Sequence, residues 1–497
     1  MSKIVGEILT FPSGNENIKL RVFGDEFYAR RESLDGYTAI YDNNLEKYCY
    51  AKLDNGKLVS TGEKINGPIP SGITPHLKEV PEVIKEKFQQ QYENSGYSNI
   101  EDINLKKNTD DGVNKTKGDN KGLLTGDRSS EGKVLGLTIL VEFSDVSTTV
   151  TSQDVEQMLN GENYNENGNY CSVKKYFNIM SNEKLEYSNH VIGPIKLPHN
   201  RDYYMNAPFP FVEEAMNIVV NDLKIDLSIY DSKRRGIVDA INFLYAGQTV
   251  YQGKLWPHNS YFSKDYNGIK TGFYMLSSLG RNVSDISIGT FCHETGHLLC
   301  RFPDLYDYGN RDGDYVDSEG IGVYCLMGSG NHLNKGRTPS PICAYLRDLV
   351  GWCDKEINLN NKGSYTIKHG DYNTVNKYNT SKENEYFIVE NRASFDLDSY
   401  LPSSGLAIYH CDIKGSNEWQ EDNLAYHYQC ALLQSDRNLD LERNVNNGDK
   451  GDLFGQGNGI VLSNSTIPSS KEWDGSDSGF IISNTSEPNI NIKIEVL

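Results

Sequence analysis

The sequence of 497 residues predicts an α+β protein, with a mixed helix and strand domain between an N-terminal block of short strands and a β-rich C-terminal region. Three observations lead to this prediction. Residues 134–145 form an almost continuous apolar run, as in a central strand that is buried on both faces. Residues 286–292 are small and apolar and lead into an HExxH motif, which is typical of a helix. After residue 352, apolar and polar residues alternate between frequent turns, which indicates strands.

The N-terminal block contains strand-like pieces up to about residue 75, separated by Gly and Asn turns, and an amphipathic helix is expected at 80–92. Residues 94–131 are rich in Asn, Asp, Lys, Gly and Ser and have few large apolar groups. This composition predicts a flexible linker. We therefore expect three folded parts joined by that linker, at residues 1–93, 132–355 and 356–497.

The HETGH motif is the most specific signal in the chain. On a helix, His293 and His297 lie one turn apart on the same face, so both imidazoles can bind one zinc ion. Glu294 projects to the side of this pair, where it can act as the general base toward water that zinc acidifies. These three residues predict a catalytic zinc site.

A catalytic zinc site takes three protein ligands, so a third is needed beside the histidines. Asp304 is favoured by ligand type and spacing, because Pro303 ends the helix and turns the chain back just before it. Cys300 is an alternative if the helix continues, although a buried, inert thiol is the commoner state of such a residue. Glu319 is a third alternative, but it lies in a stretch that is typical of a loop.

The stretch HETGHLLCRFPDLYD, followed about thirty residues later by YCLMGSG, resembles the immune inhibitor A-type metallopeptidases, which are zincins with a methionine turn like that of the metzincins. The resemblance implies zinc ligands at His293, His297 and Asp304, the general base at Glu294 and a methionine floor beneath the metal at Met327. One departure concerns Cys300, which stands where the extended motif usually has glycine. The aspartate also follows the first histidine by eleven residues rather than ten.

This likeness extends over most of the chain, and the matching segments are residues 134–145, 172–177, 181–185, 239–247, 256–258, 341–352, 390–392 and 405–412. It implies a metzincin-like catalytic domain that cleaves protein or peptide substrates. His258 lies in the matching stretch before the motif, but such a histidine is more often a loop or core residue than a ligand. The runner-up function is a metal-binding adhesion or interaction protein with little or no turnover.

The resemblance also implies that residues 1–93 are a pro-region, so the protein would be a zymogen. The alternative is a permanent structural domain. Asp25 and Cys49 are candidates for the group that blocks the zinc ion, because carboxylates and thiolates both bind zinc. Exposed loops are cut first by proteases, so trypsin is expected to cleave between Lys106 and Arg128.

Acidic residues raise the question of calcium, which is held by six to eight oxygen ligands. One cluster follows the zinc motif and supplies the candidate calcium ligands Asp307, Asp312, Asp314 and Asp317. A second cluster lies in the C-terminal region and comprises Asp436, Asp440, Asp449 and Asp452. Neither has the EF-hand spacing, and a solvated acidic loop is the alternative in both places.

Composition restricts the partners and the location. The net charge is −19 and the sequence shows no basic stripe of the kind that binds nucleic acid, so a nucleic-acid partner is not expected. No apolar run reaches the roughly 18 residues that span a bilayer, so membrane insertion is not expected either. The nine cysteines are scattered singly, so no disulfide framework is implied. Family members are mostly secreted, yet residues 1–20 lack a signal-peptide pattern, which leaves a cytoplasmic location as the alternative. We expect a monomer.

Overall fold

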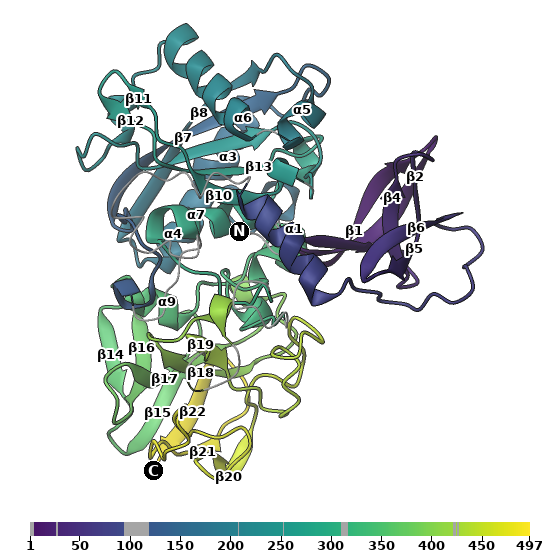
Figure 1. Cartoon of the computed structure of the whole chain (residues 1–497). Coiled ribbons are helices and arrows are strands. Elements are labelled where there is room, and N and C mark those ends of the chain that lie inside the picture. Colours follow the sequence, from purple (N-terminus) through teal and green to yellow (C-terminus); the bar gives the residue numbers. More distant parts are fainter. Residues whose placement is uncertain are drawn as a thin grey trace.

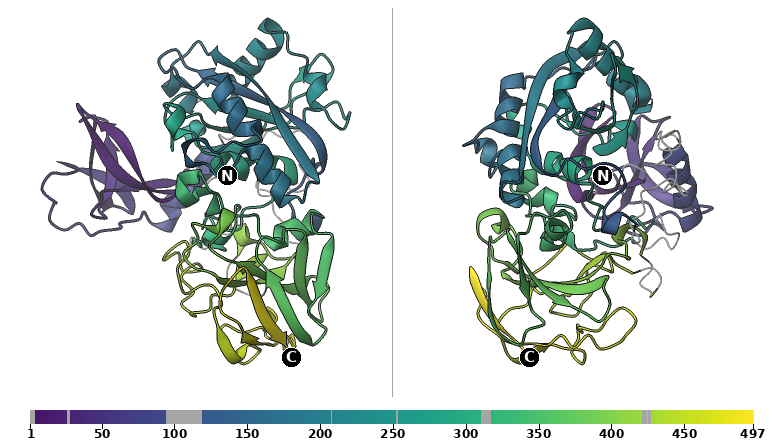
Figure 2. Two further views of the ribbon diagram at one scale, coloured as in Figure 1. Left: turned by 180° about the vertical axis from the view of Figure 1, so that it is seen from behind. Right: turned by 90° about the vertical axis from the view of Figure 1, so that its left-hand side faces the viewer.

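The computed structural model describes residues 4–25, 28–93, 119–206, 208–251, 253–309, 317–420, 424 and 427–497. An N-terminal sheet projects from the side of a central body, and a β-rich C-terminal body lies below it (Figures 1 and 2). Helices and strands are both abundant, so the predicted α+β class is confirmed. No helix in the described ranges is long and apolar enough to cross a membrane.

The N-terminal part is an antiparallel sheet whose six strands follow one another in chain order. Alternate residues of the second strand, Ile18, Leu20 and Val22, are buried, as the period of a half-buried strand requires. A helix follows the sheet, so both the short strands and the helix predicted in this block are present. The elements are β1 (Ile4–Ser13), β2 (Glu16–Gly24), β3 (Ala29–Glu32), β4 (Thr38–Asp42), β5 (Lys47–Asp54), β6 (Lys57–Lys64) and α1 (Pro81–Glu93).

The predicted linker is only partly described, since residues 94–118 lie outside the described ranges. The prediction of a flexible linker is wrong for residues 119–131, which pack against the end of the helix that carries the HExxH motif. The Leu124 amide donates to the Arg301 carbonyl at 2.8 Å, and the Ser129 amide donates to the Leu299 carbonyl at 2.9 Å. The side chains of Leu123 and Leu124 are buried, so apolar contacts and these hydrogen bonds together hold the segment.

The central body contains a five-stranded sheet in the order β10-β13-β9-β7-β8. Four strands are parallel, and β10 pairs with β13 in the antiparallel direction. The predicted strand at 134–145 is β7, the long strand beside β9, and its side chains alternate between two apolar cores. The strands are β7 (Gly132–Glu142), β8 (Leu185–Lys196), β9 (Ile241–Tyr245), β10 (His258–Tyr261) and β13 (Phe273–Ser278).

Helices cover both faces of this sheet. On one face α3 (Ser152–Asn160), α4 (Val173–Met180) and α7 (Gly289–Cys300) share a core with Val134 and Leu140 of β7. On the other face α5 (Arg201–Asn206) and α6 (Pro208–Asn217) pack against the odd-numbered residues of β7, Leu137, Ile139 and Val141. The motif helix α7 therefore lies inside the molecule, where its residues are shielded from water.

The C-terminal part contains two facing sheets, with an apolar core between them that includes Phe387, Ile408, Ile482 and Ile494. All residues of β17 and β18 are buried, because their other face packs on the central body around α9 (Ala344–Leu349). One sheet has the order β14 (Lys355–Asn358), β16 (Thr374–Asn379), β17 (Glu385–Arg392), β18 (Gly405–Asp412), β19 (Cys430–Leu432), and the other has the order β15 (Gly363–Lys368), β22 (Asn491–Val496), β21 (Ile482–Thr485), β20 (Gly457–Leu462).

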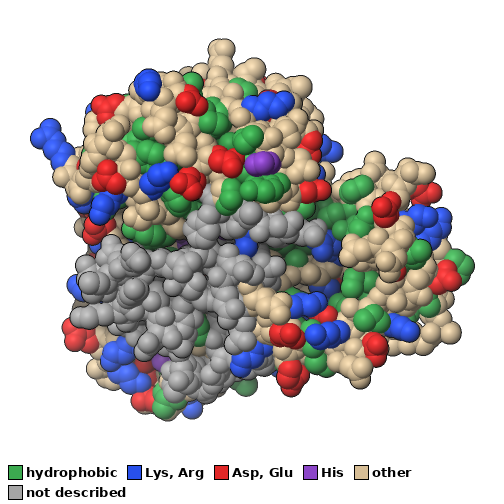
Figure 3. Space-filling model, turned by 45° about the horizontal axis from the view of Figure 1, so that its top comes forward, with side chains coloured by type: hydrophobic (Ala, Val, Ile, Leu, Met, Phe, Trp, Pro, Cys, Tyr) green, Lys and Arg blue, Asp and Glu red, His purple; other side chains and the backbone are tan. Residues whose placement is uncertain are grey.

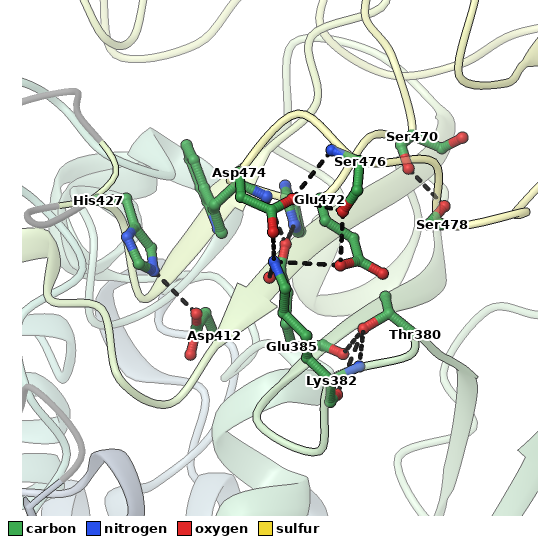
Figure 4. Close-up of polar contacts among 12 residues, drawn as sticks. Thr380, Lys382, Glu385, Asp412, His427, Ser470, Glu472, Asp474, Ser476 and Ser478 are labelled. Atoms are coloured by element: carbon green, nitrogen blue, oxygen red, sulfur yellow. Dashed lines mark hydrogen bonds and ion pairs between the residues drawn. The ribbon is translucent and has the colours of Figure 1, made fainter.

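A polar network ties the loops of these two sheets together (Figure 4). Lys382 forms ion pairs with Glu385, Glu472 and Asp474 at 2.8–3.2 Å. Beside it, the ring of Trp473 stacks on His410 and His427, with centroids 4.7 and 4.9 Å away. Burial lowers the pKa of His410, whose Nε2 lies 2.8 Å from the Glu385 carboxylate.

Acidic and basic side chains are interspersed on the face of the molecule shown in Figure 3. The net charge of −19 is therefore not gathered into a single patch on that face. None of the nine cysteines forms a disulfide in the structure, and all but the half-buried Cys353 are buried.

Candidate metal centre

The motif helix α7 ends one turn after the second histidine, and its end brings the candidate ligands together. Arg301 adopts a left-handed conformation with φ of 56°, which stops the helix, and Pro303 follows two residues later. The Arg301 guanidinium donates from Nε to the Thr125 carbonyl at 2.8 Å, which fixes the turn. The chain then returns beneath α7 and carries Asp304 back toward the histidines.

Three donor atoms of the expected zinc site converge on one point. The Nε2 atoms of His293 and His297 are 3.2 Å apart, and the Asp304 Oδ1 lies 3.2 Å from the first and 3.3 Å from the second. All three side chains are buried. They form a group of ligand atoms that can hold a metal ion.

The hydrogen bonds of the two imidazoles determine which ring nitrogen faces this point. Nδ1 of His293 donates to the Leu326 carbonyl at 2.9 Å, and Nδ1 of His297 donates to the Phe302 carbonyl at 2.7 Å. A carbonyl oxygen only accepts, so in each neutral ring the proton is on Nδ1 and Nε2 presents a lone pair. Burial lowers the pKa of His297, which favours this neutral form.

The spacing of the three atoms fits zinc. Zinc bonds of about 2.0–2.1 Å in a tetrahedron place two ligand atoms about 3.3 Å apart. The observed separations are 3.2–3.3 Å. Two nitrogen lone pairs and a carboxylate oxygen at these distances repel one another unless a cation lies between them, so the residues present fit zinc.

Asp304 is held by groups from two other segments. The Tyr308 hydroxyl donates to the Asp304 Oδ2, and the Asp304 amide donates to the Glu418 Oε1 at 2.9 Å. Burial acts to raise the pKa of the Asp304 carboxyl, but the positive charge around it holds that pKa well below its usual range. Asp304 is therefore ionised.

Glu294 lies on α7 next to the antiparallel strand β10. Its side chain is fully buried, and its backbone carbonyl accepts from the Asn259 Nδ2 in β10 at 3.4 Å. His258 begins β10 and donates from Nδ1 to the Trp256 carbonyl at 2.6 Å. Loss of solvation lowers the pKa of His258, although the Glu294 charge opposes this change. His258 lies near Glu294 but outside the ligand group.

Met327 lies against the middle of α7. A Cβ atom added to Gly296, between the two histidines, would come within 2.7 Å of the Met327 Sδ. The Met327 carbonyl accepts from the Leu305 amide at 2.8 Å, so the turn that carries Met327 also holds the returning chain. Met327 therefore packs beside the histidine pair, and the carbonyl of the neighbouring Leu326 accepts from His293.

The two alternative third ligands lie elsewhere. Cys300 is the last residue of α7 and is fully buried, and burial raises the pKa of its thiol, which disfavours the thiolate that zinc would need. Glu319 is buried in a loop, where its amide donates to the Leu441 carbonyl at 2.8 Å. Among the described residues, only Asp304 joins the two histidines in a ligand group.

The acidic cluster after the motif is only partly described, because Asp312 and Asp314 lie outside the described residues. Asp307 accepts from the Gly309 amide at 2.7 Å and from the Gln420 Nε2 at 2.7 Å. Asp317 accepts from the Asn444 Nδ2 at 2.6 Å. Within the described part of the chain, Asp307 and Asp317 do not share a metal-ligating group.

Sequence reasoning missed two residues that position Asp304. Tyr308 lies only four residues after Asp304, and this short spacing could have indicated that its hydroxyl donates to the Asp304 carboxylate. Glu418 lies 114 residues further along the chain, and no local pattern connects it to the zinc motif. The same C-terminal segment contributes Asn417, whose Nδ2 donates to the Leu305 carbonyl at 3.1 Å.

The N-terminal sheet packs beside this centre. Ile4 and Val22 form an apolar cluster with Tyr251 and Trp256, immediately before β10. Asp25 lines a cavity of about 250 Å³ together with Tyr308 and Glu319, whereas Cys49 is buried within β5 of the N-terminal sheet. Asp25 is therefore on the side of the sheet that faces the metal centre, and neither residue belongs to a ligand group among the described residues.

No protein-family model and no curated protein matches this chain. The geometry of the metal centre is therefore the main evidence of function.

Proposed function

We propose that the chain is a zinc-dependent endopeptidase of the immune inhibitor A type, with a zincin-like catalytic domain at residues 132–355. The observation that carries this proposal is the convergence of His293, His297 and Asp304 at separations that suit zinc. A zinc site with a purely structural role would not need the buried glutamate next to the first histidine. Glu294 therefore favours catalysis over the alternative, a metal-binding adhesion protein.

Zinc in this site would supply Lewis-acid chemistry, acidifying water and polarising a peptide carbonyl. Glu294 is the proton carrier: its carboxylate takes a proton from the attacking water and delivers it to the leaving amine. The Leu326 and Phe302 carbonyls orient the two imidazoles. The protein thus holds three ligands rigidly and places one base beside them.

We propose further that residues 1–93 are a pro-region. The N-terminal sheet is held to the central body by apolar contacts of Ile4 and Val22 and by the hydrogen bond of 2.9 Å from the Arg31 Nη2 to the Tyr251 carbonyl. These contacts lie next to β10 and to the loop that carries Tyr308. A domain in this place limits access to the metal centre from one side.

Hydrolysis of denatured casein tests the proposed activity. The zinc-loaded protein should cleave casein, a chelator should stop cleavage, and added Zn²⁺ should restore it. Glu294→Gln should keep its zinc but lose activity by about 10²–10⁴-fold, because it lacks the proton carrier. Glu186→Gln, on the distant strand β8, is the matched control and should behave as wild type. Zinc binding without chelator-sensitive cleavage would favour the adhesion protein instead.

A further inference from the structure

A second group of carboxylates lies in the loop between β19 and β20. Asp436, Asp449 and Asp452 each offer an oxygen, and these oxygens lie within 4.8 Å of one another. Two backbone hydrogen bonds fix the arrangement: the Ser435 amide donates to the Asp452 carbonyl at 2.9 Å, and the Asp436 amide donates to the Gly451 carbonyl at 3.1 Å. The cluster is therefore built by the backbone and is not a chance meeting of flexible side chains.

Asp452 is the buried member of this cluster. Its exposed fraction is 0%, and its Oδ2 accepts from the Tyr324 hydroxyl at 3.0 Å and from the Asp449 amide at 2.7 Å. Its Oδ1 is buried and has no hydrogen-bond partner among the residues that the structure describes. A buried carboxylate oxygen without a partner is costly, so this atom indicates a missing ligand.

The charge of the cluster is not neutralised by basic side chains. In the part of the chain that the structure describes, no lysine or arginine forms an ion pair with Asp436, Asp449 or Asp452. The known partners are neutral donors: Asn438 for Asp436, and the Gly451 amide and Asn446 for Asp449. Three carboxylates this close repel one another, and a cation between them would remove that repulsion.

We propose that Asp436, Asp449 and Asp452 bind one divalent cation, and that the ion is Ca²⁺. All the side-chain ligands are carboxylates, which suit hard cations, and the group contains no histidine or cysteine to favour zinc. An irregular loop adapts to the six to eight oxygens at about 2.3–2.6 Å that Ca²⁺ takes, whereas Mg²⁺ demands a near-ideal octahedron.

This ion would brace the turn beneath the zinc site. The Tyr324 hydroxyl shares its one proton between the Asp452 carboxylate at 3.0 Å and the Asp449 carbonyl at 2.9 Å. Tyr324 lies three residues before Met327, and the neighbouring Val323 amide donates to the Asn447 carbonyl at 2.8 Å. Fixing the carboxylates therefore fixes the segment that leads to the methionine floor.

Calorimetric titration with CaCl₂ tests the proposal on the full-length, zinc-loaded protein after EGTA treatment and desalting. Asp452→Asn and Asp436→Asn should each abolish one Ca²⁺ site per chain or weaken it at least tenfold. Asp265→Asn, which removes a charge from the exposed first residue of β11 (Asp265–Tyr266), is the matched control and should bind as wild type. Asp436 is half-buried, so its variant gives a result even if Asp452→Asn does not fold.

Hydrogen exchange supplies a second measurement that does not depend on catalysis. Ca²⁺ should slow amide exchange in residues 319–327 of the wild type and of Asp265→Asn, but not in the two cluster variants. The proposal is overturned if wild type binds no Ca²⁺ at millimolar concentration, if it binds Mg²⁺ as tightly, or if both cluster variants retain the wild-type number of Ca²⁺ sites and affinity. Because none of these readouts is peptidase activity, a failure here leaves the proposed zinc chemistry untouched.

Discussion

Asp304→Ala is the most informative test of the metal centre, because it distinguishes Asp304 from Cys300 as the third zinc ligand. The substitution removes the only anionic ligand of the group and leaves the Nε2 lone pairs of His293 and His297 in place. It also leaves the Tyr308 hydroxyl without its carboxylate acceptor. Zinc should therefore bind far more weakly.

The size of this effect follows from the ligand count. Structural zinc sites with four ligands bind with about 10–16 kcal/mol, or about 2.5–4 kcal/mol for each ligand. Loss of Asp304 should thus weaken zinc binding by about 10²–10³-fold. Tyr308→Phe, which removes only a group that orients the ligand, should cost about 10–100-fold. Cys300→Ala should change zinc affinity less than tenfold, because the thiol lies outside the group.

Competition with a zinc chelator of known affinity, followed by metal analysis, measures all three variants on one scale. Circular dichroism of each variant without metal is the control for folding. If Cys300→Ala loses zinc while Asp304→Ala retains it, the third ligand is the cysteine and the interpretation of the site is wrong. Equal affinities for Tyr308→Phe and wild type would refute only the orienting role of the tyrosine.

Three further predictions concern the surroundings of the site. Gly296→Ala should destabilise the fold by about 1–3 kcal/mol and weaken zinc binding, since its Cβ would lie 2.7 Å from the Met327 Sδ; an unchanged melting temperature would contradict this. Brief trypsin treatment should cut before residue 119, because residues 119–131 are packed, and it should raise the caseinolytic activity. If the cleaved protein is no more active than the intact chain, or if it unfolds, residues 1–93 are a structural domain. Burial lowers the pKa of His410 in the folded state, so below about pH 6.5 the unfolded chain binds a proton there that the folded protein does not. The free energy of unfolding should therefore fall by up to about 1.4 kcal/mol for each pH unit below that point. Melting curves of His410→Gln should show a weaker pH dependence, and slopes equal to those of wild type would contradict the argument.

The sequence was most informative where a local pattern determines a local structure. The apolar run at 134–145 became β7, and the alternating pieces before residue 75 became an antiparallel sheet. The HExxH spacing predicted two imidazoles on one face of a helix, and the structure has them there. Asp304, which its position after Pro303 favoured over Cys300, is the residue that lies beside them, and its role as a zinc ligand stays a prediction.

Local sequence patterns could not predict contacts between segments that lie far apart in the chain. Composition predicted that residues 94–131 form a flexible linker, but it could not show that Leu123 joins the apolar core that contains the end of α7. The hydrogen bond between the Asp304 amide and Glu418 joins segments 114 residues apart, and no periodicity reports such a contact.

The same long-range contacts argue against treating the C-terminal region as an independent module. One apolar core runs from α7 through Tyr345 of α9 to Ile388 and Tyr409 in the C-terminal sheet. Glu418 and the segment around it hold the loop that carries Asp304, and Tyr324 is anchored on Asp452. The boundary expected at residue 355 therefore separates two patterns of secondary structure, but the metal centre is assembled from both sides of it.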